Sequence, residues 1–342
     1  MKSTGEMGCS CLSWKSADGE VLWGRNFDLN ILPPDTQVTF LPSGTVYTPG
    51  GPETPPDKAR WGAVGVGTLA VPGLPMLYEG VNEAGLMGGQ LNYRGFARYP
   101  EKPKLGTVPL PPGGVVYHVL ARCAAVAEAV ELLEREVTVA AVPLLGTVPT
   151  VHWAFADGTG ESVVIEPEAD GLRICRNALG VLTNSPGYAW QRTNLLNYAA
   201  VRDLDREAGS LAEGLEPCFS GTGGQGLPGD WSSPSRFVRL AFLRRYALPG
   251  RSGEEGAARM FRLLQSAAFP LGAVRLAEEP PWEYTIYTAV LAARSRRFYW
   301  TTYGDQRVRF VDLPRLAEQG APVRFSLEEG PDFRDMTPQH GP

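Results

Sequence analysis

The order in which strand-like and helix-like segments follow one another limits the fold most strongly. Segments typical of strands come in runs that short turns join, such as the Asp18-Gly19 turn in residues 9–29, and helical patterns separate these runs. This order favours antiparallel sheets covered by helices over alternating βαβ units. The expected strands are 9–14, 21–29, 61–70, two within 76–93 joined by the Asn-Glu-Ala-Gly turn at 82–85, 150–157, 161–167, 172–184, 283–293, 296–303 and 306–313. The expected helices are 115–136, 189–204, 235–248 and 255–267.

Composition is that of a globular chain with one sizeable core. Of the 342 residues, 43% are hydrophobic and 20% are charged, and no linker divides the chain, so we expect a single domain. The net charge of −5 argues against a nucleic-acid partner. No apolar run is long enough to span a membrane, and residues 1–8 lack the apolar core of a secretory signal. We therefore expect a cytoplasmic protein with no membrane partner.

Cysteines and histidines are few and scattered. Five cysteines, an odd number at irregular spacing, argue against a disulfide framework, and Cys9 and Cys11 are too close together for a zinc-ligand pair. With three histidines in the chain, little is available to build a metal site, and we expect no metal. The chemistry of interest is that of Cys9 itself.

Cys9 gains a second reactive group if the chain is cut before it. Cleavage of the Gly8–Cys9 bond would leave a thiol and a free α-amine on one residue. The amine has a pKa of about 7.7–8 and can serve as the base for its own thiol without a histidine. The plain alternative is that Cys9 is a small buried hydrophobic residue.

Arg25 and Asp28 lie on the strand expected to pair with Cys9. A guanidinium close to the thiol would lower the thiol pKa, and a carboxylate could accept a hydrogen bond from the α-amine. The same two residues would also make an ordinary surface ion pair. Spacing alone does not decide between these interpretations.

Several stretches together resemble the choloylglycine hydrolase family of N-terminal nucleophile hydrolases, which includes penicillin V acylases and conjugated bile acid hydrolases. In that family an arginine and an aspartate follow the N-terminal cysteine by sixteen and nineteen residues in a "GRNFD"-like motif, and here Cys9, Arg25 and Asp28 have those offsets. Cys11 does not. The segments "GVNEAGLMGGQLNYRGFA", "VLTNSPGYAWQRTNLLNY" and "GLPGDWSSPSRFVRLAF" also resemble the family, and the likeness extends from Cys9 to about residue 313.

The resemblance assigns roles to three further residues. It implies that Asn92 and Asn184 supply the oxyanion donors and that Arg236 is a second active-site arginine. Taken singly, the asparagines could be turn residues and Arg236 could belong to the first turn of a helix capped by Ser233 or Ser235. In register with Cys9, they indicate catalysis.

The resemblance also implies an α+β fold, a four-layer αββα sandwich of two antiparallel sheets between helical layers, assembled as a homotetramer. It implies an amidohydrolase that cleaves a non-peptide amide through a thioester on Cys9 without a cofactor. We expect residues 1–8 to be a propeptide removed by self-cleavage, because eight residues exceed what initiator-methionine removal exposes. Residues 9–327 would form the catalytic domain, and 328–342 a C-terminal tail.

The substrate is less well defined by the sequence. Two segments look more like penicillin V acylases, whereas Asn92 stands where those enzymes often have tyrosine and bile acid hydrolases have asparagine. We expect a penicillin V acylase-like enzyme, with bile acid conjugates or N-acyl homoserine lactones as alternatives. Phe27, Leu29, Tyr93 and the loop at 61–75 are candidate substrate contacts. A catalytically silent binding protein, or a redox sensor using Cys9 and Cys11, are the alternatives outside this enzyme class.

Overall fold

Two large sheets lie face to face in the computed structural model, which describes residues 8–52, 54–206, 214, 218–277, 279–328 and 330–337. The first sheet has the strand order β14-β1-β2-β16-β17-β18, with β15 paired to β16, and the second has the order β13-β12-β11-β8-β7-β6-β3-β19. Each pairing described within them is antiparallel.

The first sheet consists of β1 (Cys9–Lys15), β2 (Val21–Leu29), β14 (Val181–Leu182), β15 (Val274–Arg275), β16 (Trp282–Ala292), β17 (Arg297–Thr302) and β18 (Arg309–Asp312). The second consists of β3 (Gln37–Leu41), β6 (Ala63–Thr68), β7 (Met76–Asn82), β8 (Met87–Asn92), β11 (Val151–Ala156), β12 (Ser162–Glu168), β13 (Gly171–Arg176) and β19 (Val323–Phe325). Two small ribbons pair β4 (Val46–Tyr47) with β5 (Asp57–Lys58) and β9 (Val108–Leu110) with β10 (Val137–Val139).

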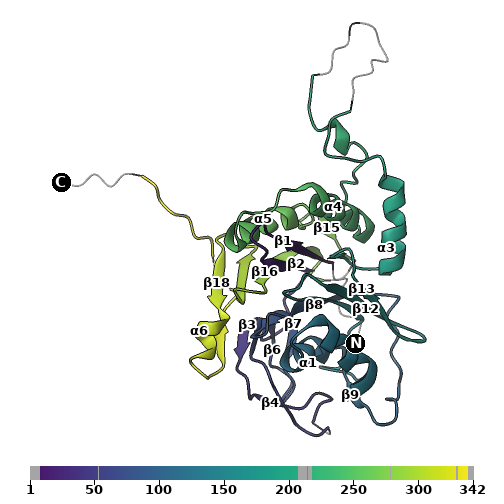
Figure 1. Ribbon diagram of the computed structural model, residues 1–342, viewed down its shortest axis with the longest axis vertical. Helices are drawn as coiled ribbons and strands as arrows, with labels where there is room; N and C mark the ends of the chain where they lie inside the picture. The colour runs from purple at the N-terminus through teal and green to yellow at the C-terminus, as the bar shows by residue number, and fades with distance from the viewer. Residues whose placement is uncertain are drawn as a thin grey trace, which may run out of the picture.

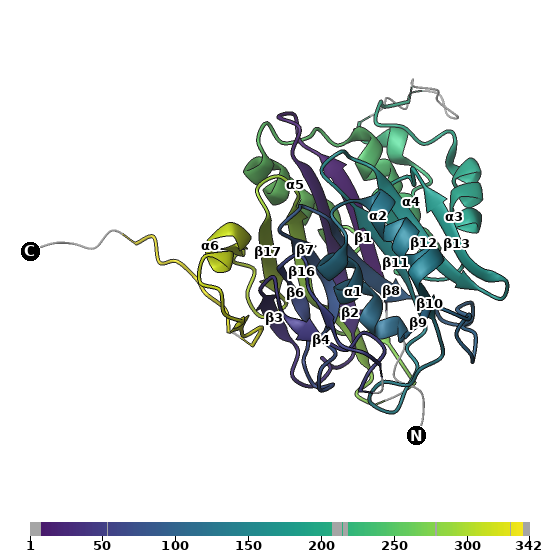
Figure 2. The ribbon, with the colours of Figure 1, turned by 60° about the horizontal axis from the view of Figure 1, so that its bottom comes forward.

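Helices cover the outer faces of both sheets. Those of the first sheet are α4 (Ser233–Tyr246) and α5 (Gly253–Gln265), and those of the second are α1 (Val115–Arg122) and α2 (Val126–Glu131) (Figures 1 and 2). The predicted α+β, four-layer αββα sandwich is therefore confirmed. The remaining helical elements are η1 (Pro112–Gly114), η2 (Leu132–Glu136), α3 (Tyr188–Asn194), η3 (Leu195–Tyr198), η4 (Thr222–Gly224) and α6 (Leu313–Ala317).

The N-terminal hairpin is formed as predicted. Gly19 adopts a positive φ of 87° in the turn, a conformation that glycine takes without strain, and the register then pairs Cys9 with Phe27 and Cys11 with Arg25. Strand β16 pairs with β2 on its other side. Strand β1 is thus paired on both sides, between β2 and the edge strand β14.

The single helix predicted for 115–136 is broken in the structure into α1, α2 and the π-helical turn η2. The chain is extended at Cys123, and side chains from outside the helix bind the backbone groups that the break exposes. Asn82 Nδ2 donates to the carbonyl oxygens of Leu120 and Cys123, and Asp157 Oδ2 accepts from the Val126 N–H. The apolar periodicity was correct, but it could not reveal these long-range caps.

The single strand predicted for 172–184 is likewise divided. Strand β13 pairs with β12 in the second sheet, whereas β14 pairs with β1 in the first. Asn177 and Gly180, both with positive φ, lie in the crossover. This change of sheet carries the chain from one layer to the other and places Asn184 next to Cys9. The helix predicted for 189–204 also ends early, at Tyr198.

The C-terminal tail predicted for residues 328–342 is described in part. Residue 328 and residues 330–337 contain no regular element, and the rest of the predicted tail, like residues 1–7, lies outside the described residues. Among the described helices, none has the length and apolar character needed to cross a bilayer.

Candidate active site

Cys9 is the first residue of β1 and is buried between the two sheets, with 2% of its surface exposed. Its Sγ lies 2.6 Å from Nη2 of Arg25, which β2 presents from the neighbouring strand. The sequence prediction that Arg25 meets the Cys9 thiol, rather than solvent, is thus supported by direct contact.

Arg25 is held by a buried carboxylate that the sequence analysis did not single out. Its Nη1 lies 3.1 Å from Oε2 of Glu79, and both side chains are fully buried. Nη1 also donates to the Gln90 carbonyl oxygen at 2.7 Å, and the Tyr287 hydroxyl donates to Glu79 Oε2 at 3.0 Å. Burial raises the pKa of Glu79 to about 7, against the opposing effect of Arg25. The sequence did offer one signal for this partner: Glu79 is the charged residue in the strand segment "MLYEGVN".

The state of the Cys9 thiol differs from the prediction while Gly8 is attached. Burial raises the pKa of the thiol, and the opposing effects of Arg25 and Arg236 do not reverse this. The guanidinium does favour the thiolate, as predicted, but desolvation is the larger effect. The unprocessed chain therefore keeps Cys9 as a neutral thiol.

Asp28 lies on β2 with its carboxyl group fully buried. The Thr285 hydroxyl donates to its Oδ1 at 2.5 Å, whereas Oδ2 has no hydrogen-bond partner among the described residues. Burial raises the pKa of Asp28 to about 6, although Arg236 and the Thr285 bond oppose this. The Cys9 N–H donates to Asn184 rather than to Asp28, so the predicted bond between Asp28 and the Cys9 nitrogen is not formed in the uncleaved chain.

Asn184 connects the other predicted residues. Its Oδ1 accepts from the Cys9 N–H at 2.9 Å and from Arg236 Nη2 at 2.7 Å, and its Nδ2 donates to the Asn92 carbonyl oxygen at 2.9 Å. Arg236, in the first turn of α4, also donates to the Cys9 carbonyl oxygen at 2.5 Å and to Ser10 Oγ at 2.7 Å. Five of the six predicted catalytic residues are therefore linked by direct contacts, namely Cys9, Arg25, Asn92, Asn184 and Arg236. Within the described part of the chain, Asp28 joins them only through its N–H, which donates to the Gly8 carbonyl oxygen.

A cleft of about 830 Å³ opens above this network, and Gly8 lies in it. The Gly8 carbonyl oxygen accepts from the Asp28 N–H at 3.1 Å, and the Gly8 N–H donates to Glu283 Oε1. A Cβ at position 8 would lie 2.8 Å from both Glu283 Oε1 and the Phe269 ring. The remaining lining residues are Asn92, Arg94, Gly95, Asn184, Ser185, Asp230, Trp231, Ser232, Arg236, Ala273, Val274 and Arg275.

The residues suggested as substrate contacts do not line this cleft. Phe27 stacks on Tyr287 at 4.9 Å between ring centroids, and Leu29 is buried. Tyr93 is 1% exposed, and its ring stacks on His152 instead of facing the cleft. The loop at 61–75 contributes no lining residue either, because the walls come from residues 94–95, 184–185, 230–232 and 269–275. Short loops without periodicity carried no signal for this role.

No group of three or more His, Cys, Asp and Glu side chains in the described part of the chain could hold a metal ion. What the arrangement can do follows from its own groups: a thiol beside a guanidinium, a nitrogen held by a carboxamide, and amide donors next to a cleft. This set is suited to nucleophilic attack on a carbonyl carbon with stabilisation of the resulting oxyanion.

Fold and site together define a cysteine hydrolase of the N-terminal nucleophile type. A model of the linear amide C–N hydrolases, choloylglycine hydrolase family, matches residues 9–318, and the chain belongs to that family. The match begins at Cys9.

Individual relatives agree with this assignment. The chain is 29% identical to a bile salt hydrolase/transferase of Clostridium perfringens over 92% of its own length and 95% of the relative's. It is 30% identical to a bile salt hydrolase/transferase of Bifidobacterium longum, with 88% and 94% covered. Among solved structures, a conjugated bile acid hydrolase of C. perfringens superposes with a TM-score of 0.87 at 26% identity, with 96% and 100% covered. A penicillin V acylase of Agrobacterium tumefaciens shares the fold, with a TM-score of 0.73 at 20% identity and 92% and 90% covered.

Proposed function

We propose that this chain is a self-processing amidohydrolase in which Cys9, once freed at its amino end, cleaves a linear amide through a thioester. The contact of 2.6 Å between Cys9 Sγ and Arg25, next to a Gly8–Cys9 bond that lies at the cleft, carries the proposal. As an N-terminal residue, Cys9 would supply both the nucleophile and its base.

Self-cleavage comes first. Cys9 Sγ attacks the Gly8 carbonyl carbon, the C–N bond to Cys9 breaks, and the thiol proton passes to the departing nitrogen. Water then hydrolyses the thioester, which releases residues 1–8 with a new carboxylate and restores the thiol. The Asp28 N–H, which already donates to the Gly8 oxygen at 3.1 Å, would stabilise the charge that develops on that oxygen.

Amide hydrolysis would then reuse the same groups. The thiolate attacks the substrate carbonyl while the α-amine takes and returns the proton, and the leaving amine departs protonated. In our assignment the Asn184 side-chain amide and the Asn92 N–H hold the oxyanion; removing one such donor typically raises the barrier by about 2.7–4 kcal/mol. Asp28 would orient the α-amine, and Arg25 and Arg236 keep the site positive.

The cleft supports a substrate whose amine half carries an acid. Arg94 and Arg275 line it together with Arg236, against the carboxylates of Asp230 and Glu283. Penicillin V and glycine- or taurine-conjugated bile acids release an amine bearing a carboxylate or sulfonate, whereas an acyl homoserine lactone releases a neutral lactone ring. We therefore propose penicillin V and bile acid conjugates ahead of homoserine lactones. The curated relatives named above favour bile acid conjugates between the two.

We also propose a cytoplasmic homotetramer. Large apolar side chains are exposed along the arm that carries α3, η3 and η4, where Trp190, Leu196, Leu204 and Phe219 are each at least half exposed. Such side chains are typical of surfaces that associate. Light scattering coupled to size-exclusion chromatography tests the tetramer, and cell fractionation tests the location.

The function is tested by intact mass and a substrate panel. The wild-type chain should lose residues 1–8 and hydrolyse at least one of penicillin V, penicillin G, or glycine- or taurine-conjugated bile acids, with acyl homoserine lactones as the comparison. Cys9→Ala should retain residues 1–8 and show no activity. A fully active wild-type chain that still carries residue 8 would refute the free-amine mechanism.

A further inference from the structure

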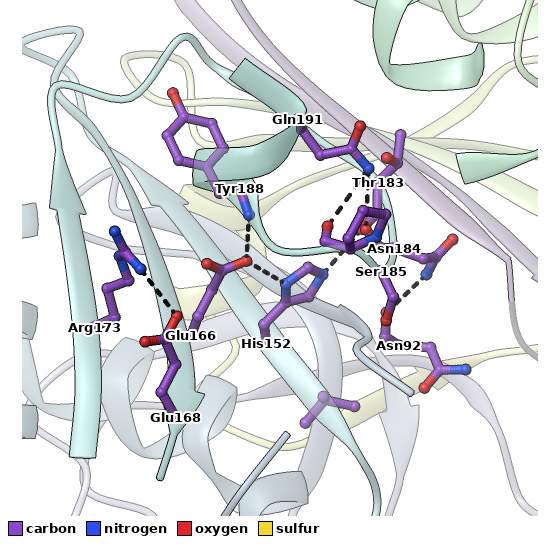
Figure 3. Close-up of polar contacts among 12 residues, drawn as sticks. Asn92, His152, Glu166, Glu168, Arg173, Thr183, Asn184, Ser185, Tyr188 and Gln191 are labelled. Atoms are coloured by element: carbon purple, nitrogen blue, oxygen red, sulfur yellow. Dashed lines mark hydrogen bonds and ion pairs between the residues drawn. The ribbon is translucent and has the colours of Figure 1, made fainter. Parts of the chain in front are cut away.

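A second group of buried titratable side chains lies directly behind Asn184, and the mechanism above does not use it. His152 on β11 and Glu166 on β12 are 0% and 1% exposed, in the space between the two sheets. His152 Nε2 lies 2.9 Å from the Thr183 carbonyl oxygen, and His152 Nδ1 lies 3.2 Å from Glu166 Oε1 (Figure 3). Thr183 is the residue before Asn184.

Both neighbours of the imidazole are acceptors. A carbonyl oxygen can only accept, so Nε2 must carry a hydrogen to bond Thr183. The carboxylate oxygen facing Nδ1 already accepts the Tyr188 N–H at 2.8 Å. A neutral imidazole has one N–H and can satisfy only one of these two contacts. A second proton between Nδ1 and Glu166 Oε1 satisfies both.

We propose that His152 and Glu166 are a positioning pair that holds one proton between them and thereby fixes the Thr183–Asn184 segment, and with it the Asn184 carboxamide, against Cys9 and Asn92. The inference rests on the function proposed above, because it assigns a role in that same site. Neither side chain touches the substrate cleft, so the pair acts through the backbone of Thr183.

The surroundings keep the imidazole in one orientation. Tyr93 stacks on the His152 ring, with 4.5 Å between ring centroids and 11° between ring planes. The other titratable groups nearby are Cys175 and Arg173 on β13 and Glu168 on β12. Arg173 and Glu168 pair with each other at 3.3 Å at the sheet edge, and Arg173 is half exposed. The shared proton therefore lies between one carboxyl group and one imidazole, with an aromatic wall at the ring face.

The segment is bound on its opposite side by uncharged groups. Ser233 Oγ accepts from the Asn184 N–H at 2.9 Å and contacts Thr183 Oγ1 at 2.9 Å, and Gln191 Nε2 donates to Ser233 Oγ at 3.2 Å. His152 supplies the bond from the second sheet. Loss of that bond would let Asn184 shift relative to Cys9, and a misplacement of about 1 Å typically lowers turnover about 100-fold.

Three variants separate positioning from packing. His152→Phe keeps the ring on Tyr93 but removes both donors, and we expect kcat to fall about 10- to 100-fold with KM little changed. His152→Gln can still donate to Thr183 and should recover much of this loss. Glu166→Gln keeps the shape of the side chain but removes the shared proton, so the imidazole has one N–H for two acceptors. We expect a kcat between those of wild type and His152→Phe. His118→Gln, at the other buried histidine, in α1, should leave kcat unchanged.

The rates are measured per processed chain, counted by intact mass, and the rate of self-cleavage is recorded alongside. Equal kcat values for His152→Phe, His152→Gln and wild type would overturn the proposal. A loss of the same size in His152→Gln and His152→Phe would do so too.

A spectroscopic measurement decides the matter even if no amide substrate is found or His152→Phe does not fold. In wild-type protein labelled with ¹⁵N-histidine, His152 should show protons bound at both ring nitrogens at pH 7.5, and Glu166→Gln should remove one of them. The His118 ring, whose pKa burial lowers to about 4, gives the neutral reference in the same spectrum. A wild-type His152 ring with one proton, together with an ionised Glu166 carboxylate in the ¹³C spectrum, would refute the pair, whatever becomes of the amidase assignment.

Discussion

The floor and the rim of the cleft are built in different ways. By the floor we mean the buried layer beneath the lining residues, which consists of side chains from central strands. Its members Arg25, Asp28 and Glu79 are all fully buried. The rim consists of loop residues such as Arg94 and of the short edge strand that carries Arg275, and both arginines are exposed. Groups on the floor have one packed arrangement, whereas groups on the rim can change position or identity at little cost in stability. We therefore expect changes on the floor to alter turnover or stability, and changes at the rim to alter substrate affinity.

The largest effect on stability is expected at Glu79. Glu79→Gln removes the buried counter-ion of Arg25, and breaking a buried ion pair from one side typically lowers the free energy of unfolding by about 3–5 kcal/mol. Urea denaturation of the Cys9→Ala chain with and without the change measures it. Arg251→Ala, which removes the exposed partner of Glu255, is the matched control and should change stability little, because an exposed ion pair is screened by solvent. Equal losses would mean that the floor is no more constrained than the surface.

The second largest effect on stability is expected at Asp28, whose carboxyl group should make the free energy of unfolding depend on pH. Its pKa is raised from 3.8 to about 6, so the folded chain favours the protonated carboxyl group. The stability that this preference contributes is present below pH 4 and is lost as the pH rises through about 6. Asp28→Asn keeps a neutral side chain and should stabilise the unprocessed Cys9→Ala chain at pH 8, by up to about 3 kcal/mol, and much less at pH 4.5.

Thermal unfolding at the two pH values checks this. Asp35→Asn is the control of opposite sign, because Arg324 lowers the pKa of Asp35 and the change should bring no gain at pH 8. A gain for Asp28→Asn that is the same at both pH values would show that the floor carboxyl is not protonated in the folded chain at pH 4.5.

The same division explains what the sequence could predict. The candidate catalytic residues Cys9, Arg25 and Asp28 lie in paired strands, where a tight turn fixes the register, and their offsets match the family motif. Glu79 and His152 were missed because their partners lie far away in the chain: Arg25 is 54 residues from Glu79, and Thr183 is 31 residues from His152. The rim was predicted wrongly in part, because Tyr93 faces His152 and the loop at 61–75 lies elsewhere. Loop positions depend on packing that a local pattern does not encode.

At the rim, Arg275→Ala is expected to raise KM about two- to five-fold for a substrate with an anionic amine half and to leave kcat unchanged. The guanidinium is exposed, and exposed ion pairs contribute about 0.2–1 kcal/mol. Steady-state kinetics at low salt and at 1 M salt measures this, since salt should remove the difference. An amide with an uncharged amine half is the control and should show no change. A fall in kcat instead would show that Arg275 affects turnover, as we expect only of residues on the floor.

The smallest effect on turnover is expected at Cys11. This residue tests whether a position on the floor is enough to give a side chain a part in catalysis. It lies two residues from Cys9 and is paired in register with Arg25, yet the guanidinium contacts Cys9 Sγ instead. Burial raises the pKa of the Cys11 thiol to about 12, so it stays neutral and unreactive at pH 7. Cys11→Ser should therefore keep kcat within about two-fold of wild type and lower the free energy of unfolding by about 1 kcal/mol, the lower end of the cost of burying a hydroxyl.

A labelling experiment compares the two thiols directly. Iodoacetamide should label Cys9 of the mature chain and spare Cys11, with peptide masses as the measurement. The contact between Arg25 and Cys9 now favours catalysis over redox sensing. If Cys11→Ser abolished a response of the protein to peroxide, that result would favour the redox sensor instead.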